Sequence, residues 1–238
     1  MSTSDSIISS RDGLLVVYWV GCLVMGFTAL YAFRSSQNVV LVRKFFHFLS
    51  VILFLPPISI DWSLDLFAVL SICVVTVMVI AECVRVTRPG CKFSLLLTRL
   101  FQPFLDKKDR GSGFITSHIE LLIACTAPVV ISQLIFPSRS FFREKNILLS
   151  GLITVGIGDS FAAIAGLATS RPLRVWRTTK TYQGMAGFVG SVLVCNWISG
   201  NGFHVIPTMA AAITEVVVKN HDNLAIPLAF ILTTYLVA

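Results

Sequence analysis

The sequence has few charged residues: Asp, Glu, Lys and Arg make up 13% of it, whereas soluble domains carry about 25%. Its six cysteines include no CxxC pair, so neither a zinc site nor a disulfide framework is indicated. The Walker A order GxxxxGK[ST] is absent, as is the alternation over about ten residues that is typical of membrane barrel strands. A cleavable signal peptide is not expected, because the first residues are polar. These absences exclude soluble, disulfide-rich and P-loop classes.

Long hydrophobic runs are what the sequence has in abundance. It is 55% hydrophobic, with a mean hydropathy of +0.82 over 238 residues. Apolar runs of about 18 residues or more are typical of transmembrane helices, so the sequence predicts an all-α polytopic bundle of about eight spans. Residues 1–13 are expected to form a polar tail, and residues 14–238 a single transmembrane catalytic domain. The expected spans are 14–33, 45–60, 64–84, 115–136, 147–169, 185–199, 203–218 and 223–238.

Basic residues are unevenly divided between the two sets of connections. Fifteen of the 19 Lys and Arg residues fall in 34–44, 85–114, 170–184 and 219–222. The positive-inside rule places these connections in the cytoplasm and the N-terminus in the lumen or outside. The net charge of +7 is thereby explained, and no nucleic-acid partner is indicated.

Asp159 lies in the run GIGDSFA, well inside the apolar residues 147–169. A charged side chain at a helix centre costs about 3 kcal/mol or more on insertion scales, so such a residue indicates function. Gly156 and Gly158 beside it predict a loosened or broken helix. The pattern indicates a cation or phosphate site at membrane depth.

The connection that follows Asp159 is basic and ends in groups suited to phosphate. Lys180 offers an ammonium, Thr181 a hydroxyl, and Gly184 a backbone amide at a helix start. An ordinary basic cytoplasmic loop is the alternative. The nearby acid favours a site for nucleotide phosphates with Mg²⁺ or another divalent cation, which needs acids and bases together.

Other ionisable residues are expected on the same cytoplasmic half, at span ends. His47 and His118 are both candidates for the general base. Glu215 and Asp222 are candidate metal ligands with Asp159, although Asp222 is also a candidate helix cap. Lys44 and Arg110 are candidates for contact with phosphate, with interface anchoring the alternative for Lys44.

Two further features of this half are structural. Glu82 and Arg85 lie three residues apart on one helical face and are expected to pair. The apolar residues within 85–114 predict an amphipathic helix at the membrane interface.

The segment 159–184 resembles the CTP-dependent polyprenol kinase family, to which the dolichol kinases belong. That family's pattern has an Asp, an Ala three residues on, a Gly seven on, and later Lys-Lys-Thr-x-Glu-Gly. This sequence departs from it at Ser170, Thr179 and Gln183. Similar too are Arg43-Lys44-x-x-His47, Thr116-Ser117-His118 and Asp222-Asn223-Leu224 with Pro227. The residues that match the main pattern are Asp159, Ala162, Gly166, Lys180, Thr181 and Gly184.

The resemblance implies transfer of the γ-phosphoryl group of CTP to the terminal hydroxyl of dolichol or another polyprenol, in the endoplasmic reticulum membrane with the site facing the cytosol. It also implies that Gly158, Ala162, Gly166 and the 180–184 turn bind the nucleotide. CTP-dependent diacylglycerol and phytol kinases share much of the pattern and remain alternatives. A cytidylyltransferase that forms a CDP-lipid is an alternative with different chemistry. An ion-coupled transporter is an alternative of another class. Transporters often contain internal repeats, but this sequence holds only one GIGDS run. The oligomeric state is open.

Overall fold

The structure is a computed structural model that describes residues 10–33, 39–59, 64–101, 113–135, 141–175 and 178–237. Within these residues the secondary structure is helical, apart from an isolated antiparallel bridge between Arg174 and Thr181. The predicted all-α fold is confirmed. The elements are α1 (Ser10–Phe33), α2 (Val39–Ser59), α3 (Leu64–Thr87), α4 (Lys92–Phe101), α6 (Ser117–Ile135), α7 (Phe141–Leu148), the π-helix η2 (Leu152–Gly158), α8 (Asp159–Ala168), α9 (Tyr182–Ile198), α10 (Val205–Val217) and α11 (Asp222–Val237).

A helix occupies each of the eight predicted spans. Five helical stretches in the described part of the chain are long and apolar enough to cross a bilayer, as expected of a multi-pass membrane protein. They are Gly13–Phe33, Val39–Ser59, Leu64–Thr87, Ser117–Leu134 and Lys145–Ala168. The 13 residues of α10 reach about 20 Å, short of a hydrocarbon core of about 30 Å. The number of crossings and the side on which the N-terminus lies therefore stay predictions.

The start of the second span differs from the prediction. Helix α2 begins at Val39, six residues before the expected start at 45, because the apolar run Val39 to Val42 continues the helix backwards. Lys44 was predicted to lie at the mouth of this span; it lies five residues after the start of α2, and it is buried. The predicted helix within 85–114 is confirmed as α4.

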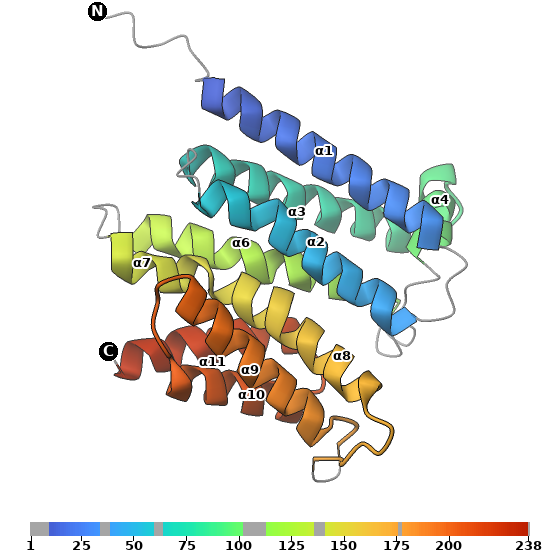
Figure 1. The fold of residues 1–238 in the computed structure, drawn as a ribbon. Coiled ribbons are helices and arrows are strands. Elements are labelled where there is room, and N and C mark those ends of the chain that lie inside the picture. The colour runs from blue at the N-terminus through green and yellow to red at the C-terminus, as the bar shows by residue number, and fades with distance from the viewer. Residues whose placement is uncertain are drawn as a thin grey trace, which may run out of the picture.

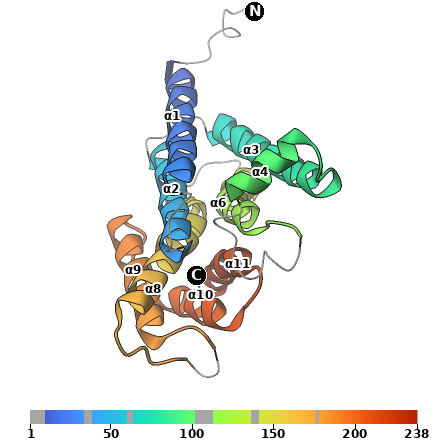
Figure 2. The same cartoon turned by 90° about the vertical axis from the view of Figure 1, so that its right-hand side faces the viewer.

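The helices form a bundle whose elements run up and down between two ends (Figure 1). Helix α2 packs against η2 near the middle, α8 packs on α9, α10 on α11, and α3 on α6. In the turned view, α3, α4 and α6 lie toward one side and α8 and α9 toward the other, with α10 and α11 below and between them (Figure 2). The start of α2, the end of α8, the end of α10 and the start of α11 therefore share one end of the bundle.

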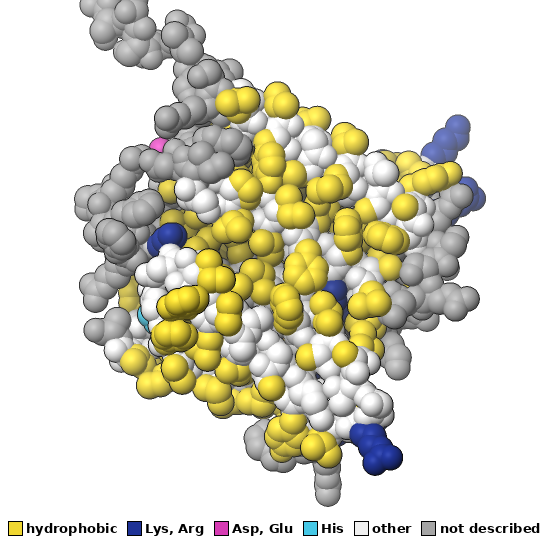
Figure 3. Space-filling model, in the orientation of Figure 1, with side chains coloured by type: hydrophobic (Ala, Val, Ile, Leu, Met, Phe, Trp, Pro, Cys, Tyr) yellow, Lys and Arg dark blue, Asp and Glu magenta, His cyan; other side chains and the backbone are white. Residues whose placement is uncertain are grey.

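Aromatic packing fixes α1, α2 and α3 together. The ring of Phe67 meets Trp19 and Phe54 edge-on, with ring centroids 5.4 and 5.3 Å apart. The indole of Trp19 donates to the Leu53 carbonyl at 3.2 Å, which satisfies its one polar group. Val17 and Val77 are among many exposed hydrophobic side chains. Hydrophobic side chains cover much of the face in Figure 3, as on a surface that faces lipid.

Candidate active site

A cavity of about 540 Å³ opens at the end of the bundle where α2, α8, α9, α10 and α11 meet. Its volume lies in the usual range of small-molecule pockets, about 300–1,000 Å³. It brings together residues that are up to 183 positions apart in the chain, from Val40 to Asn223. The predicted site residues that line it are Lys44, Asp159, Ala162, Gly166, Lys180, Thr181, Gly184, Glu215 and Asp222.

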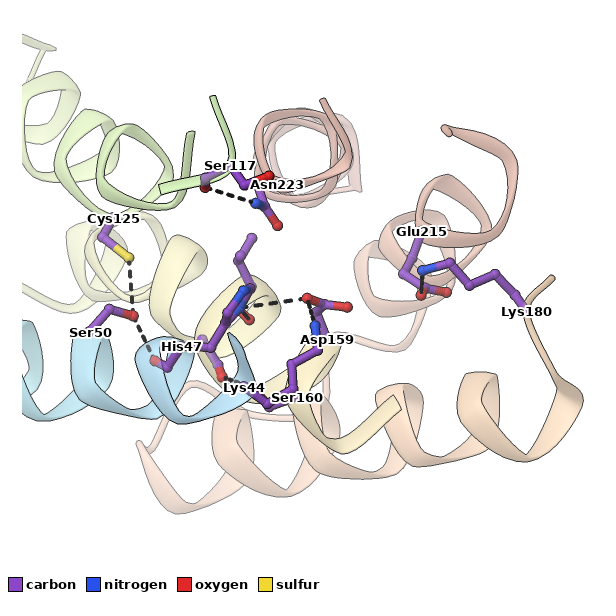
Figure 4. A network of polar contacts seen from close by, with 12 residues as sticks. Lys44, His47, Ser50, Ser117, Cys125, Asp159, Ser160, Lys180, Glu215 and Asn223 are labelled. Carbon is purple, nitrogen blue, oxygen red and sulfur yellow. Dashed lines mark hydrogen bonds and ion pairs between the residues drawn. The ribbon is translucent and has the colours of Figure 1, made fainter. Parts of the chain in front are cut away.

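Asp159 lies at the inner wall of this cavity, and two side chains of α2 hold it there (Figure 4). The ammonium of Lys44 forms an ion pair with Asp159 Oδ2, and His47 Nδ1 lies 3.5 Å from the same oxygen. All three side chains are buried. Nine residues separate Asp159 from the end of α8, so the carboxylate lies about 14 Å inside the bundle. The carboxylate is thus buried in the bundle and paired, and its depth in the membrane stays a prediction.

The helix that carries Asp159 is loosened, as expected, but it is continuous and not broken. Instead η2 winds as a π-helix up to Gly158, and the Asp159 N–H donates to the carbonyl of Thr154, five residues back. In the π-helix each N–H bonds to the carbonyl five residues back, and in the α-helix that follows each N–H bonds to the carbonyl four residues back. Where one pattern changes to the other, one backbone carbonyl, that of Val155, is left without a helical N–H partner. This carbonyl accepts a hydrogen bond from His47 Nδ1 at 3.0 Å, so Nδ1 carries the proton.

The glycines beside Asp159 serve close packing. A Cβ on Gly156 would lie 2.5 Å from Val51 Cγ2 on α2. A Cβ on Gly158 would lie 2.7 Å from Val192 Cγ2 on α9, and Gly158 is buried beneath the cavity without lining it. Gly158 therefore supports the site by letting α9 approach.

Lys180 lies opposite Asp159, on the connection between α8 and α9, and forms an ion pair with Glu215 of α10. Burial alone would lower the pKa of Lys180, but the carboxylates of Glu215 and Asp159 outweigh it, and the pKa is raised. The connection itself is a hairpin: Val175 N donates to Lys180 O at 2.9 Å, and Tyr182 N to Leu173 O at 2.9 Å. The hairpin fixes the position from which Lys180 reaches into the cavity.

The start of α9 is built for close approach to α8. The Thr181 hydroxyl caps the helix by accepting from the Gly184 N–H at 3.0 Å, so this amide is already bonded. A Cβ on Gly184 would lie 2.9 Å from the Ala162 carbonyl, and one on Gly166 would lie 3.2 Å from the Thr181 hydroxyl. The small residues of the motif thus bring the two helices together, and they also leave room at the cavity wall.

Three predicted residues lie elsewhere. His47 is behind Asp159 and does not line the large cavity. His118 lines a separate apolar cavity on the other side of α2. Arg110 lies outside the described residues.

The cavity also holds charged residues that were not predicted as site residues. Arg43, Arg174 and Lys219 line it together with Asn223. With Lys44 and Lys180 they make five cations against three carboxylates, so the lining carries a net positive charge. The starts of α9 and α11 both border it, and helix N-termini favour anions. The sequence places these cations in or beside the basic connections, but only the fold shows which of them line the cavity.

A divalent cation would need ligands from a bound substrate as well as from this lining. Among the described residues no three His, Cys, Asp or Glu side chains gather closely enough to hold a metal by themselves. Mg²⁺ is usually held by one or two carboxylates together with substrate phosphates. Asp159, Glu215 and Asp222 all line the cavity, so one or two of them could share a cation with bound phosphates; their role as metal ligands stays a prediction.

Fold and site together define a multi-pass helical membrane protein with a cationic pocket at one end of its bundle. The chain is similar to curated dolichol kinases. It is 28% identical to one from Schizosaccharomyces pombe, over 94% of this chain and 48% of that protein. It is 27% identical to one from Arabidopsis thaliana, over 91% and 39%, and 28% identical to one from Bos taurus, over 90% and 43%.

These similarities confirm the predicted resemblance to the dolichol kinases. The chain spans less than half the length of the curated relatives it matches. No protein-family model matches the sequence, and no solved structure matches it.

Proposed function

We propose that this chain is a lipid kinase that transfers the γ-phosphoryl group of CTP to the terminal hydroxyl of dolichol or a related polyprenol, giving dolichyl phosphate for glycosylation. It works in the endoplasmic reticulum membrane, and its pocket faces the cytosol. The relatives named dolichol kinase support the substrate, and the resemblance of residues 159–184 supports CTP. One observation carries the proposal: a single pocket joins Asp159 to the lysines and helix starts that suit a phosphate chain.

The nucleotide's phosphates occupy the cationic part of the pocket in this proposal. Lys180, the start of α9 and the neighbouring Arg174 neutralise them, while Gly166 and Gly184 leave room for the chain. A divalent cation, bound with Asp159 and the phosphates, supplies charge neutralisation at the transferred group. Phosphoryl transfer depends mainly on positioning and electrostatics, so a rigid carboxylate held by two α2 side chains suits it.

The depth of the pocket fits a lipid acceptor. Asp159 lies inside the bundle, whereas a kinase for a soluble alcohol needs no acid at membrane depth. A lipid alcohol presents its hydroxyl near the interface and its chain to the hydrocarbon, so the two substrates can enter the site from different sides.

A labelled-nucleotide assay on the purified, lipid-reconstituted chain tests the proposal. Transfer of γ-label to a polyprenol with release of CDP is the expected result, and ATP in place of CTP is expected to support much less transfer. Incorporation of α-label with release of pyrophosphate would identify a cytidylyltransferase instead. No transfer to any lipid alcohol would overturn the proposal.

Asp159→Asn provides the matched test of the site. It keeps the shape of the side chain but removes its charge, and we expect turnover to fall by about 10²-fold or more. Asp65→Asn is the control, because Asp65 is an exposed carboxylate in the first turn of α3, outside the pocket lining. Equal loss in both variants, or normal turnover in Asp159→Asn, would remove the assigned role.

A further inference from the structure

A second cavity, of about 190 Å³, lies among α1, α2, α3, α4 and α6, on the side of α2 away from α9. Its lining is apolar or glycine except for Ser50 and His118. Val74 and Met78 of α3 and Leu122 of α6 form part of its wall. We refer to this cavity as the apolar chamber. It plays no part in the nucleotide site described above.

The apolar chamber opens toward the lipid-facing side of the bundle. Leu23 and Phe27 of α1 line it and are themselves 42% and 63% exposed. Gly26 lies between them in the sequence, and a Cβ there would come within 3.2 Å of Leu49 Cδ2, so the glycine lets α1 lie close to α2 beside the chamber. A hydrocarbon chain can therefore enter from the membrane past α1.

A small gap lies between the apolar chamber and the cationic pocket and shares lining residues with each of them. This gap has a volume of about 10 Å³, and both α2 and α6 line it. Its polar lining residues are Arg43, His47, Ser117 and His118, and its apolar ones are Phe46 and Leu121. It shares His118 with the apolar chamber and Arg43 with the cationic pocket. His47 in turn lies beside Asp159. The apolar chamber, the small gap and the cationic pocket thus lie in that order, from the lipid-facing side toward Asp159.

We infer that the apolar chamber binds the first carbons of a single hydrocarbon chain, those next to the hydroxyl of a lipid alcohol, and that the gap at Arg43 and His47 admits this hydroxyl to the pocket. The inference rests on the proposed function and specifies its acceptor. An apolar cavity of about 150 Å³ binds a six-carbon ring, so 190 Å³ takes roughly one branched five-carbon unit. The remaining chain leaves past α1. The chamber has room for one chain, so a two-chain lipid such as diacylglycerol is excluded.

Filling the chamber tests the inference on the full-length, reconstituted protein. Val74→Phe adds bulk inside the chamber, and Val69→Phe makes the same change at an exposed position of α3 outside its lining. One methylene of misfit in an apolar pocket changes discrimination by about 10–200-fold, so we expect Val74→Phe to raise KM for the polyprenol at least tenfold and leave KM for CTP unchanged. Val69→Phe is expected to match the unmodified protein. An unchanged polyprenol KM in Val74→Phe would overturn the inference.

A photo-crosslinking measurement on the unmodified chain covers the case in which Val74→Phe does not fold. A polyprenol with a diazirine on the unit next to the hydroxyl is expected to label Met78 or Leu122. Labelling confined to α9, α10 or α11 would overturn the inference. So would turnover of diacylglycerol equal to that of the polyprenol.

Failure of the proposed function is distinguishable from failure of this inference. A chain that phosphorylates no lipid alcohol contradicts the kinase itself. A chain that phosphorylates polyprenol normally, with a chamber that can be filled at no cost, contradicts only the route of the acceptor.

Discussion

The ion pair between Lys44 and Asp159 yields the largest expected change in stability. Lys44→Met keeps the length of the side chain and removes the cation from a pair whose members are 8% and 6% exposed. Removing one partner of a buried pair costs about 3–5 kcal/mol, because the other charge is left unpaired. His47 Nδ1, 3.5 Å from Asp159 Oδ2, offsets part of this, so we expect a loss of about 3 kcal/mol. At about 2–4 °C per kcal/mol for a chain of this size, Tm falls by about 6–12 °C.

Thermal unfolding in lipid or detergent, followed by tryptophan fluorescence, measures this loss. The double variant Lys44→Met with Asp159→Asn removes both charges and is expected to recover most of the lost Tm, while remaining inactive. The interaction free energy from the four proteins should reach about 2 kcal/mol, within the range of about 0.5–3 kcal/mol seen for residues in contact. Additive losses, with no recovery in the double variant, would refute the buried ion pair.

Three further predictions concern the bundle and the α8–α9 hairpin. Glu215→Gln removes the carboxylate that raises the pKa of Lys180 most, so burial counts for more and the pKa should fall. Amine-selective labelling of Lys180 at pH 8 should therefore accelerate. In the unmodified protein the pKa of Lys180 is raised, so the ion pair stabilises the fold fully below the ordinary lysine pKa of about 10.4, and this stabilisation is lost only at higher pH. Gly151→Ala puts a Cβ 2.0 Å from a backbone oxygen of α6 and should lower stability by about 1–3 kcal/mol or more, whereas Gly190→Ala meets nothing and should be neutral in thermal unfolding. Thr181→Ala should cost about 1 kcal/mol by uncapping α9, and Thr181→Ser should restore it; equal Tm values would contradict the cap.

Local patterns predicted much of the site because its chemistry is concentrated in one stretch of sequence. Asp159 and Lys180 are separated by one helix and one hairpin, and both line the same cavity, as expected. The pairing of Glu82 with Arg85 is confirmed, with guanidinium–carboxylate distances of 2.7 and 2.8 Å, because three residues along a helix fix their proximity.

Partners that are distant in the chain could not be predicted. Lys44 meets Asp159 across 115 residues, and His221 bonds to Glu120 at 2.8 Å across 101 residues. Nothing in local composition specifies which of several lysines pairs with which acid. Lys44 also followed the common pattern of an interface anchor, and only the packing of α2 on η2 shows it to be buried.

The π-helix from Leu152 to Gly158 sets the direction in which the following residues of the same helix face. Five-residue bonding accommodates one residue more than an α-helix of the same span, and each added residue turns the rest of the helix by about 100°. Deleting one residue from this stretch would leave an apolar span of nearly the same length. It would nevertheless rotate the carboxylate of Asp159 away from Lys44 and His47. The chemistry at this end of the protein is therefore encoded in the number of residues before the acid as well as in the acid itself.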